Sequence, residues 1–220
     1  KGATSNNKAE WRSTYGESPE YVLFGDWQVC FQTYADLYKL DPDTIKIARA
    51  REVMEYQMST SKLDYWHWVD ALYMVMPVMV KMYDITKNPL YLEKLHQYLT
   101  VTDSIMYDRE VGLYYRDAKY PYPFHKTING KKDFWSRGDG WAFAAFAKVL
   151  KQLPAEDKYR EEYITRFQTM AKSIAACQQP EGYWTRSLID PEQAPGPETS
   201  GTALFTYGFL WGINNGLLNA

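Results

Sequence analysis

The chain has 220 residues, of which 45% are hydrophobic and 24% are charged. A chain of this length and composition buries a sizeable core, so we expect a globular protein of one domain spanning 1–220. The net charge of -2 and the pI near 6.0 provide no basic surface for nucleic acid. No apolar run is long enough for a membrane span, so neither nucleic acid nor a membrane is an expected partner.

Helical periodicity covers most of the chain after an irregular lead-in at 1–25. Aspartate or asparagine before proline at 41–42 and 88–89 indicates two helix starts. Two long loops, 108–134 and 179–198, interrupt the pattern, and long loops inside compact domains are usually functional. The predicted helices span 26–40, 42–58, 66–86, 89–107, 137–152, 156–178 and 199–218.

These helices alternate in character along the chain. The first, third, fifth and seventh are apolar, whereas the second, fourth and sixth are amphipathic and charged. A repeated helical hairpin with an inner and an outer helix explains this alternation, and such hairpins form an α/α toroid. The loops that precede the inner helices then converge at one end, where a site can form.

The third helix carries a carboxylate at the mouth of a mostly apolar segment. Asp70 lies beside His67 and Trp68, and the residues after it are apolar on nearly every helical face. One interpretation is a buried structural acid that neighbouring side chains satisfy. The other is a catalytic acid whose pKa is raised by its apolar pocket, which His67 and nearby aromatic residues line.

Acids also stand at the starts of two other inner helices, at Asp26 and Asp139. If equivalent positions face one mouth, Asp26, Asp70 and Asp139 approach one another, and their mutual repulsion raises at least one pKa. For Asp139 the alternative is a helix N-cap. Arg137 fits an anion site walled by flat rings, and its alternative is a structural arginine stacked on tryptophan.

Aromatic residues make up 16% of the chain, and such side chains fill cores or stack on the flat faces of sugars. Trp184 in the second loop is therefore a further candidate for substrate binding. Cys30 and Cys177 have no partner at metal-ligand spacing and are expected to be packed thiols. The three histidines form no metal spacing, so we expect neither a metal nor an organic cofactor.

Four ordered segments resemble the signature regions of unsaturated uronyl hydrolases, and most closely those of glycoside hydrolase family 105. The resemblance implies an (α/α)6 barrel that hydrolyses the 4,5-unsaturated uronic acid left by polysaccharide lyases at a non-reducing end. Because that barrel has more helices than this chain, we expect terminal helices to be missing at both ends. The segments are 25–34 (GDWQVCFQTY), 66–77 (WHWVDALYMVMP), 134–142 (FWSRGDGWA) and 196–203 (GPETSGTA).

By this resemblance Asp70 corresponds to the general acid/base and Asp26 to the second carboxylate. Trp135, Arg137 and Trp141 match the substrate-contact motif of the family. The implied chemistry protonates C4 of the vinyl ether and adds water at C5, after which the hemiketal opens and releases the sugar.

Arg116 stands where family members often have histidine, which points to a different uronic acid or linkage. The expected function is hydrolysis of an unsaturated uronyl end on an oligosaccharide, in the periplasm or cytoplasm of a bacterium. Two alternatives stay open: a sugar-binding or scaffold toroid without activity, and a polysaccharide lyase on the same barrel. A lyase needs a strong base near a group that neutralises the uronate.

Overall fold

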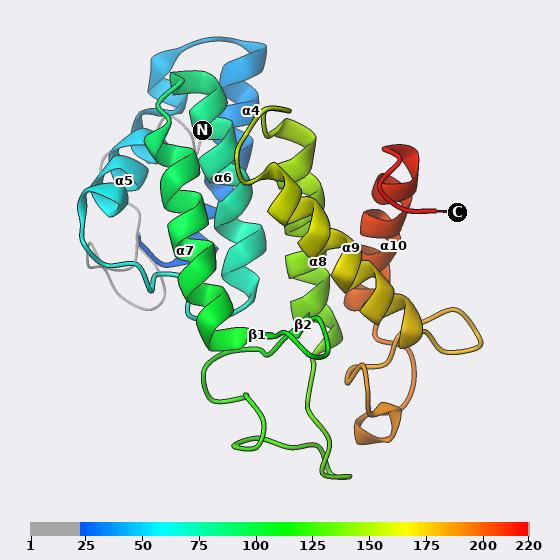
Figure 1. Ribbon diagram of the computed structural model, residues 1–220. Helices are drawn as coiled ribbons and strands as arrows, with labels where there is room; N and C mark the ends of the chain where they lie inside the picture. The colour runs from blue at the N-terminus through cyan, green and yellow to red at the C-terminus, as the bar shows by residue number, and fades with distance from the viewer. Residues whose placement is uncertain (1–22, 220) are drawn as a thin grey trace.

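The computed structural model describes residues 23–219, and this part of the chain is built mainly of helices (Figure 1). Two short strands and two 3₁₀ turns are the other regular elements described. The helices are α3 (Gly25–Gln28), α4 (Cys30–Leu40), α5 (Ala48–Ser59), α6 (Asp70–Thr86), α7 (Leu90–Met106), α8 (Ser136–Gln152), α9 (Arg160–Ala176) and α10 (Thr199–Asn214). The remaining elements are η1 (Thr44–Lys46), η2 (Pro191–Gln193), β1 (Tyr107–Asp108) and β2 (Leu113–Tyr114).

The helices form two layers. Helices α4, α6, α8 and α10 make the inner layer, in which α6 packs on α4 and α8, and α8 packs on α10. Outside them, α7 packs on α6 and on α5, and α9 packs on α8. This arrangement confirms the predicted alternation of inner and outer helices in an α/α barrel fold.

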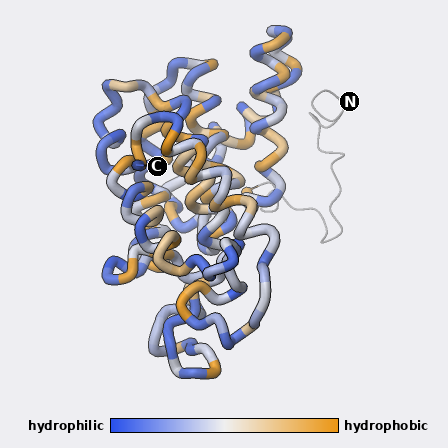
Figure 2. Tube along the Cα trace, turned by 90° about the vertical axis from the view of Figure 1, so that its right-hand side faces the viewer, coloured by the Kyte–Doolittle hydropathy of each residue, from blue (hydrophilic) through white to orange (hydrophobic). Residues whose placement is uncertain are grey.

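Burial explains the alternation. Helix α8 is rich in alanine and glycine and buries most of its length, which lets α6 and α10 pack closely on either side. Helix α9 buries a single stripe that includes Phe167 and Ile174, as expected for an outer amphipathic helix. Figure 2 shows hydrophobic residues recurring along the helices, while the loops at the lower end are mostly hydrophilic.

The loops gather at one end of the layers. Helices α6, α8 and α10 all begin at the end that carries the 109–135 loop and the 177–198 loop (Figure 1). The predicted convergence of loops at the starts of inner helices therefore holds for the described residues. Within them, no helix is long and apolar enough to cross a membrane.

Several boundaries differ from the sequence prediction. The first predicted helix is interrupted at Val29, between α3 and α4, and α5 begins at Ala48 after the 3₁₀ turn η1. The third begins at Asp70 instead of Trp66, because the preceding residues pair with a distant loop. Trp68 forms an isolated bridge with Asp117. The predicted lead-in 1–25 lies mostly outside the described residues.

Candidate active site

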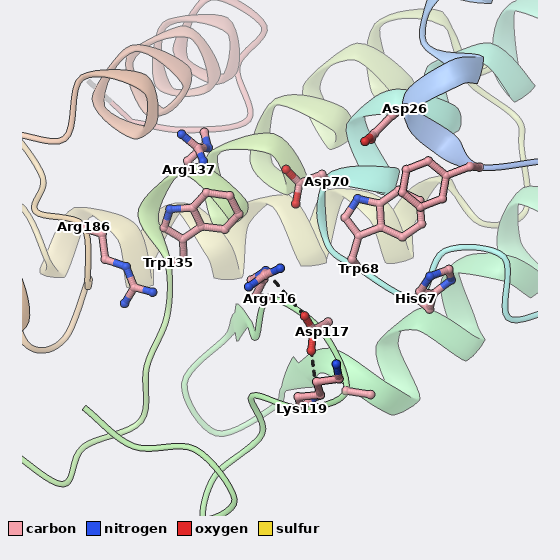
Figure 3. A pocket seen from close by; sticks show the side chains of 12 residues that line it. Asp26, His67, Trp68, Asp70, Arg116, Asp117, Lys119, Trp135, Arg137 and Arg186 are labelled. Carbon is pink, nitrogen blue, oxygen red and sulfur yellow. Dashed lines mark hydrogen bonds and ion pairs between the residues drawn. The ribbon is translucent and has the colours of Figure 1, made fainter. Parts of the chain in front are cut away.

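A cavity of about 770 Å³ opens at the loop end of the inner layer (Figure 3). Side chains from α3, from the starts of α6 and α8 and from both long loops form its wall. The lining residues are Phe24, Asp26, His67, Trp68, Asp70, Arg116, Asp117, Ala118, Lys119, Trp135, Arg137 and Arg186.

Two carboxyl groups face this cavity from neighbouring helices. Asp70 is the first residue of α6, and Asp26 lies in the short helix α3, which packs on the first turns of α6. Gly25 permits this close approach, because a Cβ there would lie 3.2 Å from Val75 Cγ2 and 3.3 Å from Ala71 Cβ. The two acids therefore share one side of the cavity.

Both carboxyl groups have raised pKa values. Burial raises the pKa of Asp70 most strongly, and the negative charge of Asp26 raises it further, while Arg137 and Arg116 oppose the shift. Burial also raises the pKa of Asp26. A carboxyl group of this kind keeps its proton to higher pH and can donate it to a substrate.

An extended segment places Arg116 and Trp68 opposite each other. The backbone N–H of Val69 donates to the carbonyl of Arg116 at 2.9 Å, beside the bridge between Trp68 and Asp117. The guanidinium of Arg116 in turn donates to the Tyr120 hydroxyl at 3.0 Å. The 109–135 loop is thus fixed to the residue before Asp70 and forms a wall of the cavity.

The start of α8 contributes a cation stacked on an indole. The guanidinium carbon of Arg137 lies 4.3 Å from the ring centroid of Trp135. Arg137 has no ion pair among residues 23–219, and its side chain is exposed. This exposed and unpaired guanidinium is suited to binding a carboxylate.

Gly138 fixes the distance between this cation and the acids. A Cβ at Gly138 would lie 2.8 Å from Val69 Cγ1 and 3.0 Å from Trp135 Cε3. Gly138→Ala must push the start of α8 away from α6, so we expect a loss of roughly 1 to 3 kcal/mol of stability. Urea unfolding measures this loss, with Gln97→Ala on an exposed face of α7 as the control. Equal stability of the two variants would show that the Val69 side chain can move aside without a loss of stability.

A second guanidinium reaches the cavity from the 177–198 loop. Trp135 bridges Ser187, and Ser136 N–H donates to the Arg186 carbonyl at 2.9 Å, so Arg186 lies beside Trp135. Arg186 Nη1 donates to Asp133 Oδ1 at 2.6 Å, and His125 Nε2 lies 2.9 Å from the other oxygen of this buried carboxylate. These contacts lower the pKa of Asp133 despite its burial and hold Arg186 in place.

Two acids of the cavity lie apart from two of its cations, whereas a third acid, Asp117, lies 3.6 Å from Arg116. Asp26 and Asp70 lie on one side, whereas Arg137 and Arg186 flank Trp135 on the other (Figure 3). A ligand with a carboxylate can bind the cations while it presents a neighbouring carbon to the acids. The indoles of Trp68 and Trp135 offer flat faces for a sugar ring.

The structure brings most predicted site residues together, but it places two elsewhere. Trp184 is only 3% exposed, and its indole N–H donates to the Ile174 carbonyl at 2.7 Å, so it belongs to the core beneath α10. Trp141 lies against Tyr73, with ring centroids 4.5 Å apart, and does not line this cavity. The residues that do line it are Asp26, His67, Trp68, Asp70, Arg116, Trp135 and Arg137.

The expectation that Asp139 joins the other two acids is wrong. Its side chain is fully buried, and its Oδ1 accepts the Tyr114 N–H at 2.8 Å. The N-cap alternative fails too, because Trp135 precedes the first residue of α8 and Asp139 lies inside the first turn. Glycines on both sides of Asp139 bring this turn close to its neighbours, so the carboxyl points away from the cavity.

The sequence analysis did not single out Arg186, Asp117 or Lys119 as site residues, although the long loops that contain them were expected to be functional. None of them lies in a periodic segment, and their positions depend on the two isolated bridges, which join residues far apart in the chain. The only available signal was the length of the two loops. Among residues 23–219, no group of three or more histidine, cysteine or acidic side chains is arranged to hold a metal ion.

Known proteins resemble this chain in sequence. It is 37% identical over 153 residues to an unsaturated 3S-rhamnoglycuronyl hydrolase of Alteromonas sp. strain LOR, covering 70% of this chain and 37% of that protein. A protein of the same name from Formosa agariphila is 36% identical over 165 residues, covering 73% of this chain and 44% of that protein. The matched part of the chain thus spans less than half the length of these curated relatives.

Solved structures resemble it as well. A protein described as a polysaccharide lyase is 74% identical with a TM-score of 0.91, covering 100% of this chain and 62% of that one. A family 105 glycoside hydrolase of C. acetobutylicum has a TM-score of 0.76 at 21% identity, covering 93% of this chain and 61% of that one, and shows the fold. The sequence profile of Glycosyl Hydrolase Family 88 matches residues 4–220. The resemblance to unsaturated uronyl hydrolases is thereby confirmed, and the chain belongs to Glycosyl Hydrolase Family 88.

Proposed function

We propose that the cavity binds a 4,5-unsaturated uronic acid at the non-reducing end of an oligosaccharide and removes it by adding water across the double bond. The observation that carries this proposal is Asp70, a carboxyl group with a raised pKa that faces a cavity with an unpaired guanidinium. Since the chain spans only part of the length of its relatives, the activity of the protein as a whole is part of the proposal.

In this proposal Asp70 donates its proton to C4 of the vinyl ether. Positive charge then develops at C5 and the ring oxygen, and a water molecule adds at C5. Asp26 or the newly ionised Asp70 accepts the proton of that water. The resulting hemiketal opens, and the aglycone leaves with its oxygen. The step requires one acid that can also act as a base, so it differs from the nucleophile-and-acid pair of retaining glycosidases.

The cations have a separate role. Arg137 binds the carboxylate at C5, and Trp135 beneath it supports the guanidinium and the sugar face. Trp68 offers a second ring, itself stacked on Phe24 with centroids 4.1 Å apart. Arg186 extends this cationic wall toward the 177–198 loop, and Arg116 adds a guanidinium from the 109–135 loop, so the next sugar of the oligosaccharide would lie between the two loops.

Elimination is the second candidate, and one observation favours it. The protein of 74% identity that covers this whole chain is described as a polysaccharide lyase. A lyase removes the C5 proton and protonates the oxygen leaving C4, while a cation neutralises the carboxylate. His67, Asp26, Asp70 and Arg137 all line this cavity, so side chains that could take the roles of acceptor, donor and cation are present. Hydration adds a proton at C4 and water at C5, whereas elimination removes a proton from C5 and breaks the bond between C4 and its oxygen, so both reactions act on the same two carbons of a uronic acid.

The ultraviolet absorbance of the C4=C5 double bond separates these candidates. We expect the full-length protein to lower this absorbance on oligosaccharides that carry an unsaturated end. A lyase instead raises it on intact uronic-acid polysaccharide, and a binding protein changes neither. Asp64→Asn is the matched control for site variants, because Asp64 lies before the same helix with a side chain that is 59% exposed. If the absorbance changes on neither substrate while the protein still binds the oligosaccharide, both enzymatic candidates are wrong and the protein only binds sugar.

A further inference from the structure

Asp139 is a buried acid that the proposed reaction does not use. Its Oδ1 accepts the backbone N–H of Tyr114 at 2.8 Å, and its Oδ2 has no hydrogen-bond partner within the described part of the chain. Burying a carboxyl group with one oxygen unsatisfied is energetically unfavourable, so the one hydrogen bond that it does make is the place to look for its role. Its role must therefore lie in the link between α8 and β2.

This link joins two walls of the cavity. Asp139 follows Arg137 by two residues in the first turn of α8, and Tyr114 precedes Arg116 by two residues. The carbonyl of Arg116 in turn accepts the N–H of Val69, which precedes Asp70. The carboxyl group of Asp139 thus connects the helix that carries Arg137 with the strand just before Arg116. The Arg116 carbonyl extends this connection to the start of α6, which carries the proposed acid Asp70.

We infer that Asp139 is a positioning residue: its carboxyl group holds the segment of Arg116 against the first turn of α8 and so sets the separation of Arg116 and Arg137 across the cavity. This inference rests on the proposed function, in which both guanidinium groups face the substrate. Asp139 itself does not touch the substrate.

Burial disfavours the charged form of this carboxyl group. Complete burial raises the pKa of Asp139 well above its usual value, with only the Tyr114 N–H opposing the shift. Asparagine has nearly the same shape, keeps the accepting oxygen and is neutral, so it is the conservative replacement. Alanine removes the acceptor and leaves the Tyr114 N–H unsatisfied. The Tyr114 hydroxyl donates to Asp103 at 2.6 Å, which keeps the strand attached in either variant.

Amide hydrogen exchange tests the link without relying on activity. We expect Asp139→Ala to speed exchange at the Tyr114 amide by roughly 3-fold to 10-fold, as loss of one hydrogen bond between that N–H and the Asp139 side chain predicts. Exchange at Val69 should also speed up, because its N–H donates to Arg116 in the segment that Asp139 holds. Asp139→Asn should exchange as the wild type does. Met54→Ala, in the core of α5, is the control for a general loss of stability. Unchanged exchange in the alanine variant would overturn the inference whatever the protein does with sugars.

A double-mutant cycle tests the role in binding. With an unsaturated uronyl disaccharide, we expect Asp139→Ala to raise KM by about 10-fold with little change in kcat, and Asp139→Asn to restore it. If Asp139 acts through Arg116, Asp139→Ala should raise KM only slightly further in a protein that already carries Arg116→Ala. Additive effects, or an asparagine variant as defective as alanine, would overturn the inference. The proposed function is tested separately, by whether the wild type binds and turns over the same disaccharide.

Discussion

Asp70→Asn should lower kcat by roughly 100-fold to 10,000-fold, the usual contribution of general acid/base catalysis, while substrate still binds. Asparagine keeps the size of the side chain and can form hydrogen bonds, but it cannot transfer a proton. The fold should survive, because a neutral amide removes the cost of burying a charge at the start of α6. Loss of the double-bond absorbance measures turnover, and calorimetry on the same variant measures binding.

The pH dependence follows from the direction of the pKa shift. Burial and the charge of Asp26 raise the pKa of Asp70, and the proton must be present when the substrate arrives. Activity should therefore decline as the pH rises through that raised pKa. The proton on Asp70 also stabilises the folded state below the unfolded pKa of about 3.9, and this contribution is lost as the pH rises through the folded pKa.

Asp70→Asn removes the loss of stability that ionisation of Asp70 causes as the pH rises, because asparagine does not ionise. The difference in stability between the variant and the wild type should therefore favour the variant more at pH 7 than at pH 4. Thermal melts of both proteins at the two pH values measure this difference. Asp64→Asn, on the exposed approach to the same helix, should change neither kcat nor this comparison. If Asp70→Asn binds normally and turns over near the wild-type rate, Asp26 or another group is the acid and Asp70 is structural.

Much of the fold could be predicted because helical periodicity is local. The stripe on α9 and the all-round apolar character of α6 are visible in fewer than twenty residues of sequence each. The start of α6 was misplaced for a nonlocal reason. Trp66 to Val69 fit a helical pattern, but the Val69 N–H donates to the carbonyl of Arg116 in the distant 109–135 loop, and no local pattern encodes that pairing.

The site shows the same division. Asp26, Asp70 and Arg137 could be predicted as candidates because each stands at the start of an inner helix beside an aromatic residue, and all three line the cavity. Asp139 has the same sequence context, yet it faces β2 instead of the cavity. The direction depends on helix phase and on close packing at Gly138, which sequence spacing alone does not determine. Arg186 reaches the cavity only through the bridge between Trp135 and Ser187.

Arg137→Ala should raise KM for the uronyl substrate by on the order of 10-fold to 100-fold, since a charge-assisted hydrogen bond contributes roughly 1.5 to 3 kcal/mol. Little loss of stability is expected, because the side chain is exposed and has no ion pair within residues 23–219. Its one described contact is the stack on Trp135 at 4.3 Å.

Arg137→Lys separates charge from shape. Lysine keeps the positive charge but lacks the planar pair of donors that a carboxylate accepts, so it should restore KM only in part. Arg51→Ala is the matched control, because Arg51 is an exposed arginine on α5 that pairs with Glu55 away from the cavity. Initial rates across substrate concentrations give KM and kcat for each variant. An unchanged KM in Arg137→Ala would assign this guanidinium to the structural stack on Trp135, and the carboxylate of the substrate would then have to bind Arg116 or Arg186.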